Sequence, residues 1–443
     1  MSYIPHTHDE KQSMLSAIGV SHVDELFNSI PAKIFNHEID LPEPMSEMEL
    51  VEYMDMLACQ NQQIRHLFLG GGSYQHFIPK AVTELVHRSE FYTAYTPYQP
   101  EMSQGMLQAI FEYQTVIARI TGMDVSNASL YDGATALYEA SVMAMDHTKR
   151  REILFETSVH PHYREVLNTY AAATNFTIKS IPYSNGVATS LLPSSVTDLT
   201  AAVVVQYPDF FGRIGDLSAI KQACESKKAL LILVVNPLLS VVLKSPRQLG
   251  ADICVGDAQP LGLPLSYGGP YVGFIACTSD LTRRLPGRLV GETVDTKGRR
   301  GFVLTLQARE QHIKRERASS NICSNQALCA LQVLIYVSLM GKVGLERAAT
   351  LSIQNAHETV EFLCKIPGIK LLFDSPFCYE FSIRLPIKAS KFLASAPSDL
   401  APGLDLGCWH PELDHCVLTA ITECSSRESL SRLLSFYRTA FDK

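Results

Sequence analysis

Residues 229–259 read ALLILVVNPLLSVVLKSPRQLGADICVGDAQ and contain two short apolar runs, 229–235 and 251–257. Both runs are apolar at nearly every position, so neither leaves a polar face for water. Strands that are apolar on both faces belong to a sheet covered by helices on each side, and such sheets are mostly parallel. This stretch therefore predicts an α/β fold.

Similar runs occur on both sides of this stretch, at 151–157 (REILFET), 201–207 (AAVVVQY) and 271–278 (YVGFIACT). Stretches with helical periodicity separate them. A helix is expected from Ser103 to Thr121, closed by Gly122, and a longer one from Ser324 to about 340. We predict three parts in chain order: an N-terminal helical arm (1–65), a large α/β domain (66–322), and a linking helix with a small C-terminal α+β domain (323–443).

Composition excludes several classes of function. The net charge of −7 argues against nucleic acid as a partner. No apolar run comes near the roughly 20 residues needed to cross a bilayer, and the N-terminus lacks the pattern of a signal peptide. The eleven cysteines form no C-x-x-C pair, and the paired histidines lack further zinc ligands. We expect a cytoplasmic protein with reduced thiols, no metal site and no membrane contact.

The order of elements resembles the pyridoxal-phosphate (PLP) enzymes of fold type I, built on the aspartate-aminotransferase fold. Their chemistry needs three anchors. The phosphate binds free N–H groups at a helix N-terminus, and the ring nitrogen needs a carboxylate at the end of a strand. The aldehyde forms a Schiff base with a lysine on a later loop.

Each anchor position can be located in this sequence, and each is altered. Asp132 is the expected N-cap of the phosphate helix, where its charge would repel a phosphate. The neutral Asn236 follows the strand that should end in aspartate, and Gln259 stands where the lysine belongs. No lysine lies between 250 and 270, and Lys244 is expected on the wrong side of the intervening helix. An α/β protein that never held the cofactor remains an alternative.

Longer motifs connect the chain with a family. These are GGGSYQHFIP (70–79), the stretch that begins FYTAYTPYQPEMSQG (91–140), ADICVGDAQPLGLPLSYGGP (251–270), and the stretch from LPGRLVGE to ERASSNIC (285–323). They closely resemble the N-terminal half of glycine decarboxylase, the P-protein of the glycine cleavage system.

The resemblance implies a division of labour between two chains. Some organisms make one long chain of two homologous halves and others make two separate chains, and the present length matches a separate first subunit. The resemblance places the cofactor lysine in the second subunit, so this chain would hold no covalent cofactor. Together the subunits, expected as α2β2, would act as an oxidoreductase on glycine. They would release carbon dioxide and pass the aminomethyl group to the lipoyl arm of the H-protein, in a system that also includes the T- and L-proteins.

Relatives of this fold type place active sites at subunit interfaces. The best candidate for a loop that completes the partner's site is formed by Tyr95, Thr96, Pro97, Tyr98, Gln99 and Glu101, because hydroxyl and amide groups on a proline-stiffened loop can orient a bound carboxylate. An aromatic packing loop is the competing interpretation. Arg288 and His312 are possible contacts with the partner or the H-protein. The competing interpretations are that Arg288 belongs to a solvated helix face and that His312 is a structural histidine.

Two glycine clusters have simpler interpretations. Gly268 and Gly269 are expected in a tight turn, and Gly70–Gly72 in a flexible approach loop. Two other functions stay open, a non-catalytic scaffold for the partner and an independent enzyme with its own cofactor.

Overall fold

The computed structural model describes residues 6–35, 40–187 and 191–441. The chain forms two compact units, Met1–Gln62 and Gln63–Lys443, called here the arm and the body. The arm contains α1 (His8–Ile18), the 3-10 helix η1 (Val23–Phe27) and α2 (Glu47–Cys59). Capping boxes start both α-helices, with Thr7 and Glu10 at α1 and Ser46 and Glu49 at α2.

A seven-stranded sheet forms the centre of the body, in the order β2-β8-β7-β6-β5-β3-β4. Its five neighbouring strands from β7 to β4 are parallel, and β8 and β2 are the antiparallel additions at one edge. The strands are β2 (Val125–Ser126), β3 (Glu152–Glu156), β4 (Thr177–Ile181), β5 (Thr200–Tyr207), β6 (Leu230–Val235), β7 (Ile253–Asp257) and β8 (Gly273–Cys277). The predicted, mostly parallel sheet is confirmed.

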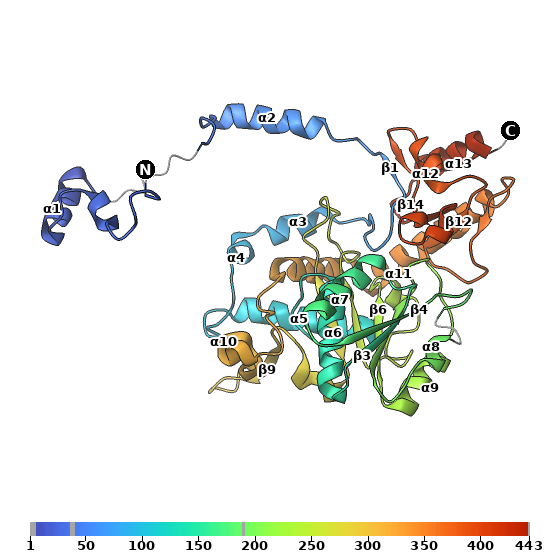
Figure 1. Ribbon diagram of the computed structural model, residues 1–443, viewed down its shortest axis with the longest axis horizontal. Helices are drawn as coiled ribbons and strands as arrows, with labels where there is room; N and C mark the ends of the chain where they lie inside the picture. Colours follow the sequence, from blue (N-terminus) through green and yellow to red (C-terminus); the bar gives the residue numbers. More distant parts are fainter. Residues whose placement is uncertain (1–5, 36–39, 188–190, 442–443) are drawn as a thin grey trace. The chain divides into compact units, whose positions relative to one another are not determined.

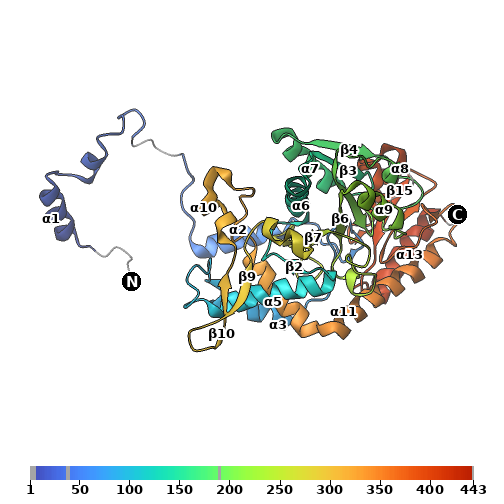
Figure 2. The same ribbon diagram turned by 90° about the horizontal axis from the view of Figure 1, so that it is seen from below.

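Helices cover both faces of this sheet (Figures 1 and 2). In β6, Leu231 and Leu233 pack in one apolar cluster, whereas Ile232 and Val234 pack in the other. The first cluster includes α3 (Lys80–Val86), α5 (Gln104–Thr121), α9 (Ser218–Lys227) and α11 (Ala327–Leu363), and the second includes α6 (Gly133–Thr148) and α7 (Pro161–Ala173). Alternation between two buried faces explains why the runs are apolar throughout.

Helix α11 corrects the expectation that no segment of the chain is long and apolar enough to cross a bilayer. By length and composition alone it could cross a bilayer, with a mean hydropathy of 1.8 over its most apolar window. Its Val333 and Tyr336 are fully buried in the cluster that covers the sheet. At Gly341 the backbone turns to φ +61°, which bends the helix. Part of the apolar surface of α11 therefore belongs to the core of the body, whereas Leu339 and Val343 are exposed.

A second, four-stranded antiparallel sheet lies in the C-terminal part, in the order β11-β12-β15-β14. Its core includes Phe381, Phe392, Leu433 and Tyr437. The elements here are β11 (Lys370–Leu371), β12 (Glu380–Arg384), α12 (Ala389–Ala394), β14 (Leu404–Asp405), β15 (Cys416–Ala420) and α13 (Arg427–Phe441). This mixture of helices and an antiparallel sheet is the α+β pattern expected after the linking helix.

Several smaller elements complete the body. The strand β1 (His66–Leu67) pairs with β13 (Leu400–Ala401), which ties the start of the body to its C-terminal part. A hairpin of β9 (Val290–Val294) and β10 (Arg300–Leu304) precedes α10. The short helices are α4 (Ser89–Tyr92), α8 (Leu191–Ser194), η2 (Leu239–Val241), η3 (Ser279–Arg284), η4 (Gln307–Arg309), α10 (Gln311–Lys314), η5 (Arg315–Arg317), η6 (Leu406–Cys408) and η7 (Pro411–Leu413).

Candidate functional site

The fold brings the three altered anchor positions together. Asn236 follows β6, Gln259 follows β7, and Asp132 precedes α6. The strands β6 and β7 are parallel neighbours, so the segments after them meet at one edge of the sheet. A cavity of about 50 Å³ remains there, lined among others by Asn236, Asp257 and His160.

Gln259 is 1% exposed, and hydrogen bonds engage its whole amide. Its Oε1 accepts from the Tyr74 N–H at 2.9 Å, and its Nε2 donates to the carbonyl oxygens of Tyr74 at 2.8 Å and Leu263 at 2.9 Å. The side chain thus links the segment after β7 to the glycine-rich loop. A lysine could not replace it, because an ammonium group has no acceptor for the Tyr74 N–H.

The N-terminus of α6 is occupied by carboxylates of the chain itself. Asp132 caps it, accepting from the Thr135 N–H at 2.7 Å, and Asp257 accepts from the Gly133 N–H at 3.3 Å. Burial raises the pKa of Asp257 to about 7, although N–H donors from Gln259 and Gly133 oppose the rise. A bound phosphate would have to displace both carboxyl groups from the N–H groups that it needs.

Asn236 also has an internal role. Its Oδ1 accepts from the Leu238 N–H at 3.0 Å, and its Nδ2 donates to the hydroxyl of Tyr379. The amide therefore caps the turn after β6 and ties it to the C-terminal part. It offers no negative charge to a pyridinium nitrogen.

These residues do not fit PLP. No lysine lines the cavity, whose volume of about 50 Å³ suits one or two waters. Ligand pockets for molecules of cofactor size are several-fold larger, on the order of 300 Å³ or more. Among the described residues, no group of three His, Cys, Asp or Glu side chains is arranged to hold a metal.

The glycine-rich loop is fixed at the mouth of this cavity. The Gly71 N–H donates to Glu380 Oε1 at 2.6 Å, and the Tyr74 hydroxyl donates to Glu380 Oε2 at 2.8 Å. A Cβ on Gly70 would lie 2.1 Å from Glu380 Oε1, so only glycine fits there. The expectation of a flexible approach loop was wrong, because the glycines allow close packing on a buried carboxyl group.

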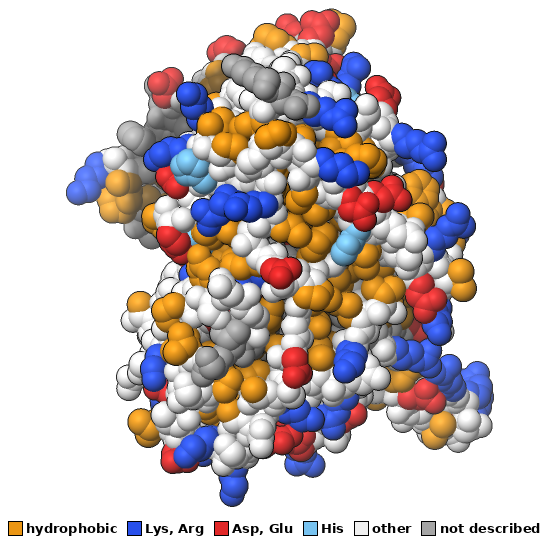
Figure 3. All heavy atoms as spheres, turned by 90° about the vertical axis from the view of Figure 1, so that its right-hand side faces the viewer, with side chains coloured by type: hydrophobic (Ala, Val, Ile, Leu, Met, Phe, Trp, Pro, Cys, Tyr) orange, Lys and Arg blue, Asp and Glu red, His pale blue; other side chains and the backbone are white. Residues whose placement is uncertain are grey.

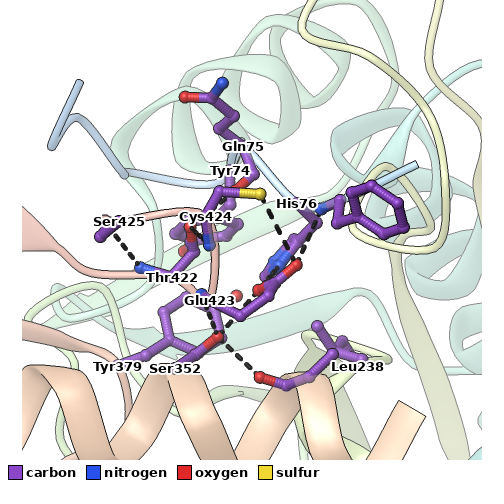
Figure 4. Close-up of polar contacts among 12 residues, drawn as sticks. Tyr74, Gln75, His76, Leu238, Ser352, Tyr379, Thr422, Glu423, Cys424 and Ser425 are labelled. Carbon is purple, nitrogen blue, oxygen red and sulfur yellow. Dashed lines mark hydrogen bonds and ion pairs between the residues drawn. The ribbon is translucent and has the colours of Figure 1, made fainter. Parts of the chain in front are cut away.

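A second contact holds the other end of the same loop (Figure 4). His76 Nδ1 lies 2.8 Å from Glu423 Oε2, and the Phe77 N–H donates to Glu423 Oε1 at 2.8 Å. Ser352, on α11, donates to Glu423 Oε2 at 3.0 Å. The loop is therefore fixed to both α11 and the C-terminal part.

The tight turn expected at Gly268 and Gly269 is confirmed. Both residues have positive φ values, +113° and +128°. The Gly268 N–H donates to the carbonyl oxygen of Leu265 at 2.9 Å, which closes the turn.

The loop Tyr95–Glu101 presents its aromatic side chains on the surface. Tyr95 is 82% exposed and Tyr98 is 52% exposed. Thr96 shares a hydrogen bond with Ser324, which ties the loop to the segment before α11. Gln99 and Glu101 lie in the turn that leads into α5, where the Gln99 carbonyl accepts from the Met102 N–H at 3.1 Å.

Arg288 and His312 both contact Tyr98 of this loop. Arg288 is only 2% exposed, so its side chain is not available at the surface for a direct contact with another chain. Its Nη2 donates to the Tyr98 hydroxyl at 3.2 Å, and the guanidinium carbon lies 4.9 Å from the centre of the Tyr98 ring. The rings of His312 and Tyr98 pack in a T-shaped arrangement, with 6.0 Å between ring centroids.

The sequence reasoning missed two members of this cluster. Glu310 forms a buried ion pair with Arg288, with 3.0 Å between Nη1 and Oε2. Cys323 Sγ lies 3.1 Å from Arg288 Nη2. Burial acts to raise the pKa of Cys323, but hydrogen bonds from Ser324 and Arg288 outweigh it, so the pKa falls below its usual value. The need of a buried arginine for a carboxylate could have indicated Glu310.

Comparison with known proteins agrees with this geometry. The family model "Glycine cleavage system P-protein" matches residues 1–437. The chain belongs to this family. A relative from Desulfitobacterium hafniense, named "Probable glycine dehydrogenase (decarboxylating) subunit 1", is 48% identical over 440 residues, covering 98% of this chain and 99% of the relative. A relative of the same name from Anoxybacillus flavithermus is also 48% identical and covers 98% of this chain and 97% of its own length.

Solved structures place the P-protein fold among PLP enzymes. A crystal structure of glycine decarboxylase (P-protein) in inhibitor-bound form superposes with a TM-score of 0.93 at 42% identity, covering 100% of both chains. C-DES, solved with glycine linked to its PLP cofactor, matches with a TM-score of 0.61 at 16% identity, covering 86% of this chain and 97% of that one. The predicted fold type I architecture is confirmed.

Replacing Gln259 with lysine should destabilise the chain. The variant leaves the Tyr74 N–H without an acceptor and buries an unpaired ammonium group, which should lower the free energy of unfolding by about 3–5 kcal/mol. Urea denaturation measures the change. Gln75→Lys, at an exposed position of the same loop, is the matched control and should change stability by less than about 0.5 kcal/mol. Equal stability of the two variants would contradict the role of Gln259.

Replacing Glu380 with glutamine should change how stability depends on pH. Burial raises the pKa of Glu380 to about 7 from 4.5, so the folded state keeps a proton that the unfolded state releases. Stability from this group is complete below about pH 4.5 and is lost as the pH rises to 7. Thermal unfolding from pH 4.5 to 8 should show the wild type losing about 1–3 kcal/mol relative to Glu380→Gln. Parallel curves would contradict the assignment.

Proposed function

We propose that this chain is the first subunit of a two-chain glycine dehydrogenase (decarboxylating), in which the second subunit carries PLP. The pair would release carbon dioxide from glycine and transfer the aminomethyl group to the lipoyl arm of the H-protein. The names of the full-length relatives support the activity. The observation that supports this division of labour is the small size of the cavity, about 50 Å³. A chain with this architecture and no room for PLP needs a second chain to supply it.

The contribution of this chain would come from the loop Tyr95–Glu101. Arg288 and Glu310 form a rigid base beneath it, since both side chains are almost fully buried and paired with each other. Tyr98 is hydrogen-bonded to Arg288 of this pair, and half of the Tyr98 surface is exposed. A side chain held in place before binding loses less entropy when it meets a partner or ligand. The loop is thus suited to orient a carboxylate or cofactor group in the second subunit's site.

Further features of the assembly belong to the same proposal. We expect two copies of each subunit, α2β2, acting in the cytoplasm and linked in function to the T- and L-proteins. The resemblance to P-proteins supports this arrangement. The slightly acidic composition and the core location of α11 favour protein and small-molecule partners over nucleic acid or membrane.

A reconstitution assay tests the proposal. Purified chain, PLP-loaded second subunit and lipoylated H-protein should together exchange labelled bicarbonate into glycine. The second subunit without this chain should show no exchange above background. Full exchange by the second subunit alone would contradict the proposal, and PLP bound by this chain alone would instead favour an independent enzyme.

Tyr98→Phe separates an active role from a scaffold. Loss of the hydroxyl should lower kcat/KM in the reconstituted enzyme by roughly 3–10-fold, the size of one hydrogen bond, while the two subunits still co-elute. Tyr170→Phe, on the outer helix α7 and 38% exposed, is the matched control and should leave kcat/KM unchanged. Unchanged turnover in Tyr98→Phe with assembly intact would favour the scaffold.

A further inference from the structure

The body contains a second cavity, next to the loop Tyr95–Glu101. Its volume is about 190 Å³, and its lining includes residues of the loop, Arg288, and the segment that leads into α11. Because a water takes about 30 Å³ in the liquid, this room suits a molecule of roughly six non-hydrogen atoms. On the face drawn in Figure 3, basic and acidic side chains lie scattered among one another. The cavity is therefore a clearer candidate site for a small charged ligand than that face.

One wall of the cavity is the N-terminus of α11. No side chain of the described residues caps this helix end. The Ala330 N–H donates to the carbonyl oxygen of Gln326 at 2.9 Å, so the N–H groups of Ala327, Leu328 and Cys329 have no partner within the helix. Ala327 and Leu328 line the cavity. Unpaired N–H groups and the helix dipole give this wall a partial positive charge.

The helix α6 shows how the same chain satisfies such a helix end elsewhere. There the carboxylate of Asp132 accepts from the Thr135 N–H, and Asp257 accepts from the Gly133 N–H. At α11 the N-cap residue is Gln326, whose side chain makes no capping bond. Within the described part of the chain, carboxylates are thus supplied at α6 but not at α11.

The buried Arg288 forms another part of the wall. Its Nη1 and Nη2 are already bonded, to Glu310, Tyr98 and Cys323. Its Nε is buried and has no hydrogen-bond partner among the described residues. A buried donor without an acceptor is costly, and an acceptor in the cavity would remove that cost.

The charges and the lining define the class of ligand. Glu310 neutralises Arg288, so the remaining positive charge is that of the helix end, about half an elementary charge. This suits one negative charge better than the two of a phosphate. The side chains of Phe91, Met106 and Ile110 make another part of the lining apolar. A small carboxylate with a short carbon chain matches both features.

We infer that this cavity binds a small organic carboxylate. The carboxylate oxygens accept hydrogen bonds from the N–H groups at the start of α11 and from Arg288 Nε, and the carbon chain packs on the apolar side chains. Every residue of the site belongs to this chain. The inference therefore goes beyond the proposed two-chain enzyme and does not require the second subunit.

Alkylation of individual cysteines in the purified full-length chain tests the inference. Cys323 is exposed and lines the cavity, whereas Cys364 is exposed at the other end of α11 and serves as the internal reference. Butyrate is the probe, and butyramide, which has the same shape without the charge, is its control. Rates of reaction with iodoacetamide are measured by mass spectrometry of the peptides, at constant ionic strength.

Butyrate should protect Cys323 alone. At about four times its Kd, it should slow alkylation of Cys323 about fivefold, because the occupied fraction of the protein cannot react. The rate at Cys364 should not change, and butyramide should slow neither reaction. Inorganic phosphate should protect Cys323 less than butyrate does at the same concentration.

Two variants locate the site on α11. Gln326→Asp places a carboxylate at the N-cap, where it should cap the helix and occupy the N–H groups that the ligand needs. Protection by butyrate should be lost in this variant, although the fold is not weakened. Gln354→Asp makes the same change at an exposed position further along α11 and should keep the protection seen in the wild type.

Each other result would overturn the inference. No protection by butyrate would show that the cavity does not bind a carboxylate. Equal protection by butyramide would show an apolar cavity, and stronger protection by phosphate would show a site for a different anion. Full protection in Gln326→Asp would show that the start of α11 takes no part. Because the second subunit is absent from the experiment, these results leave the proposed function unaffected.

Discussion

The three hydrogen bonds of the Gln259 amide are the contact on which the altered pocket depends. They join the segment after β7 to the backbone of Tyr74, and so fix the glycine-rich loop over the edge of the sheet. Once that loop is in place, Tyr74 and Gly71 can donate to Glu380 in the C-terminal part. A lysine side chain at this position could not make these hydrogen bonds to the backbone and also form a Schiff base with a cofactor. The contacts that close the pocket therefore also leave no free side chain at this position for a cofactor.

The closed pocket keeps its polar groups without a ligand. Asp132 and Asp257 take the N–H groups of α6 that a phosphate would use, and Asn236 caps its own turn. Burial raises the pKa values of Asp257 and Glu380 to about 7, so that part of the negative charge is removed by protons near neutral pH. Together these residues form a polar core that connects the two parts of the body. The proposed functional surface is the loop at Tyr98, which lies outside this pocket.

Sequence reasoning succeeded where a local pattern has one structural solution. Runs apolar on both faces predicted the covered parallel sheet, and Gly122 and Asp132 marked a helix end and a helix start that the structure reproduces. It failed where the outcome depends on contacts distant in sequence. Gly70–Gly72 suggested flexibility, because Glu380, about 310 residues away, is invisible in the local pattern. Arg288 was expected at the surface for the same reason, since its burial depends on Glu310 and Tyr98 together.

The central claim is that one chain of each pair has given up the cofactor and the other holds it. The cofactor content of the purified, active complex tests this most directly, measured as moles of PLP released by alkali per mole of each subunit. The account predicts one PLP for each pair of chains, all of it bound to the second subunit after separation. Two PLP molecules per pair, or PLP retained by this chain, would contradict it.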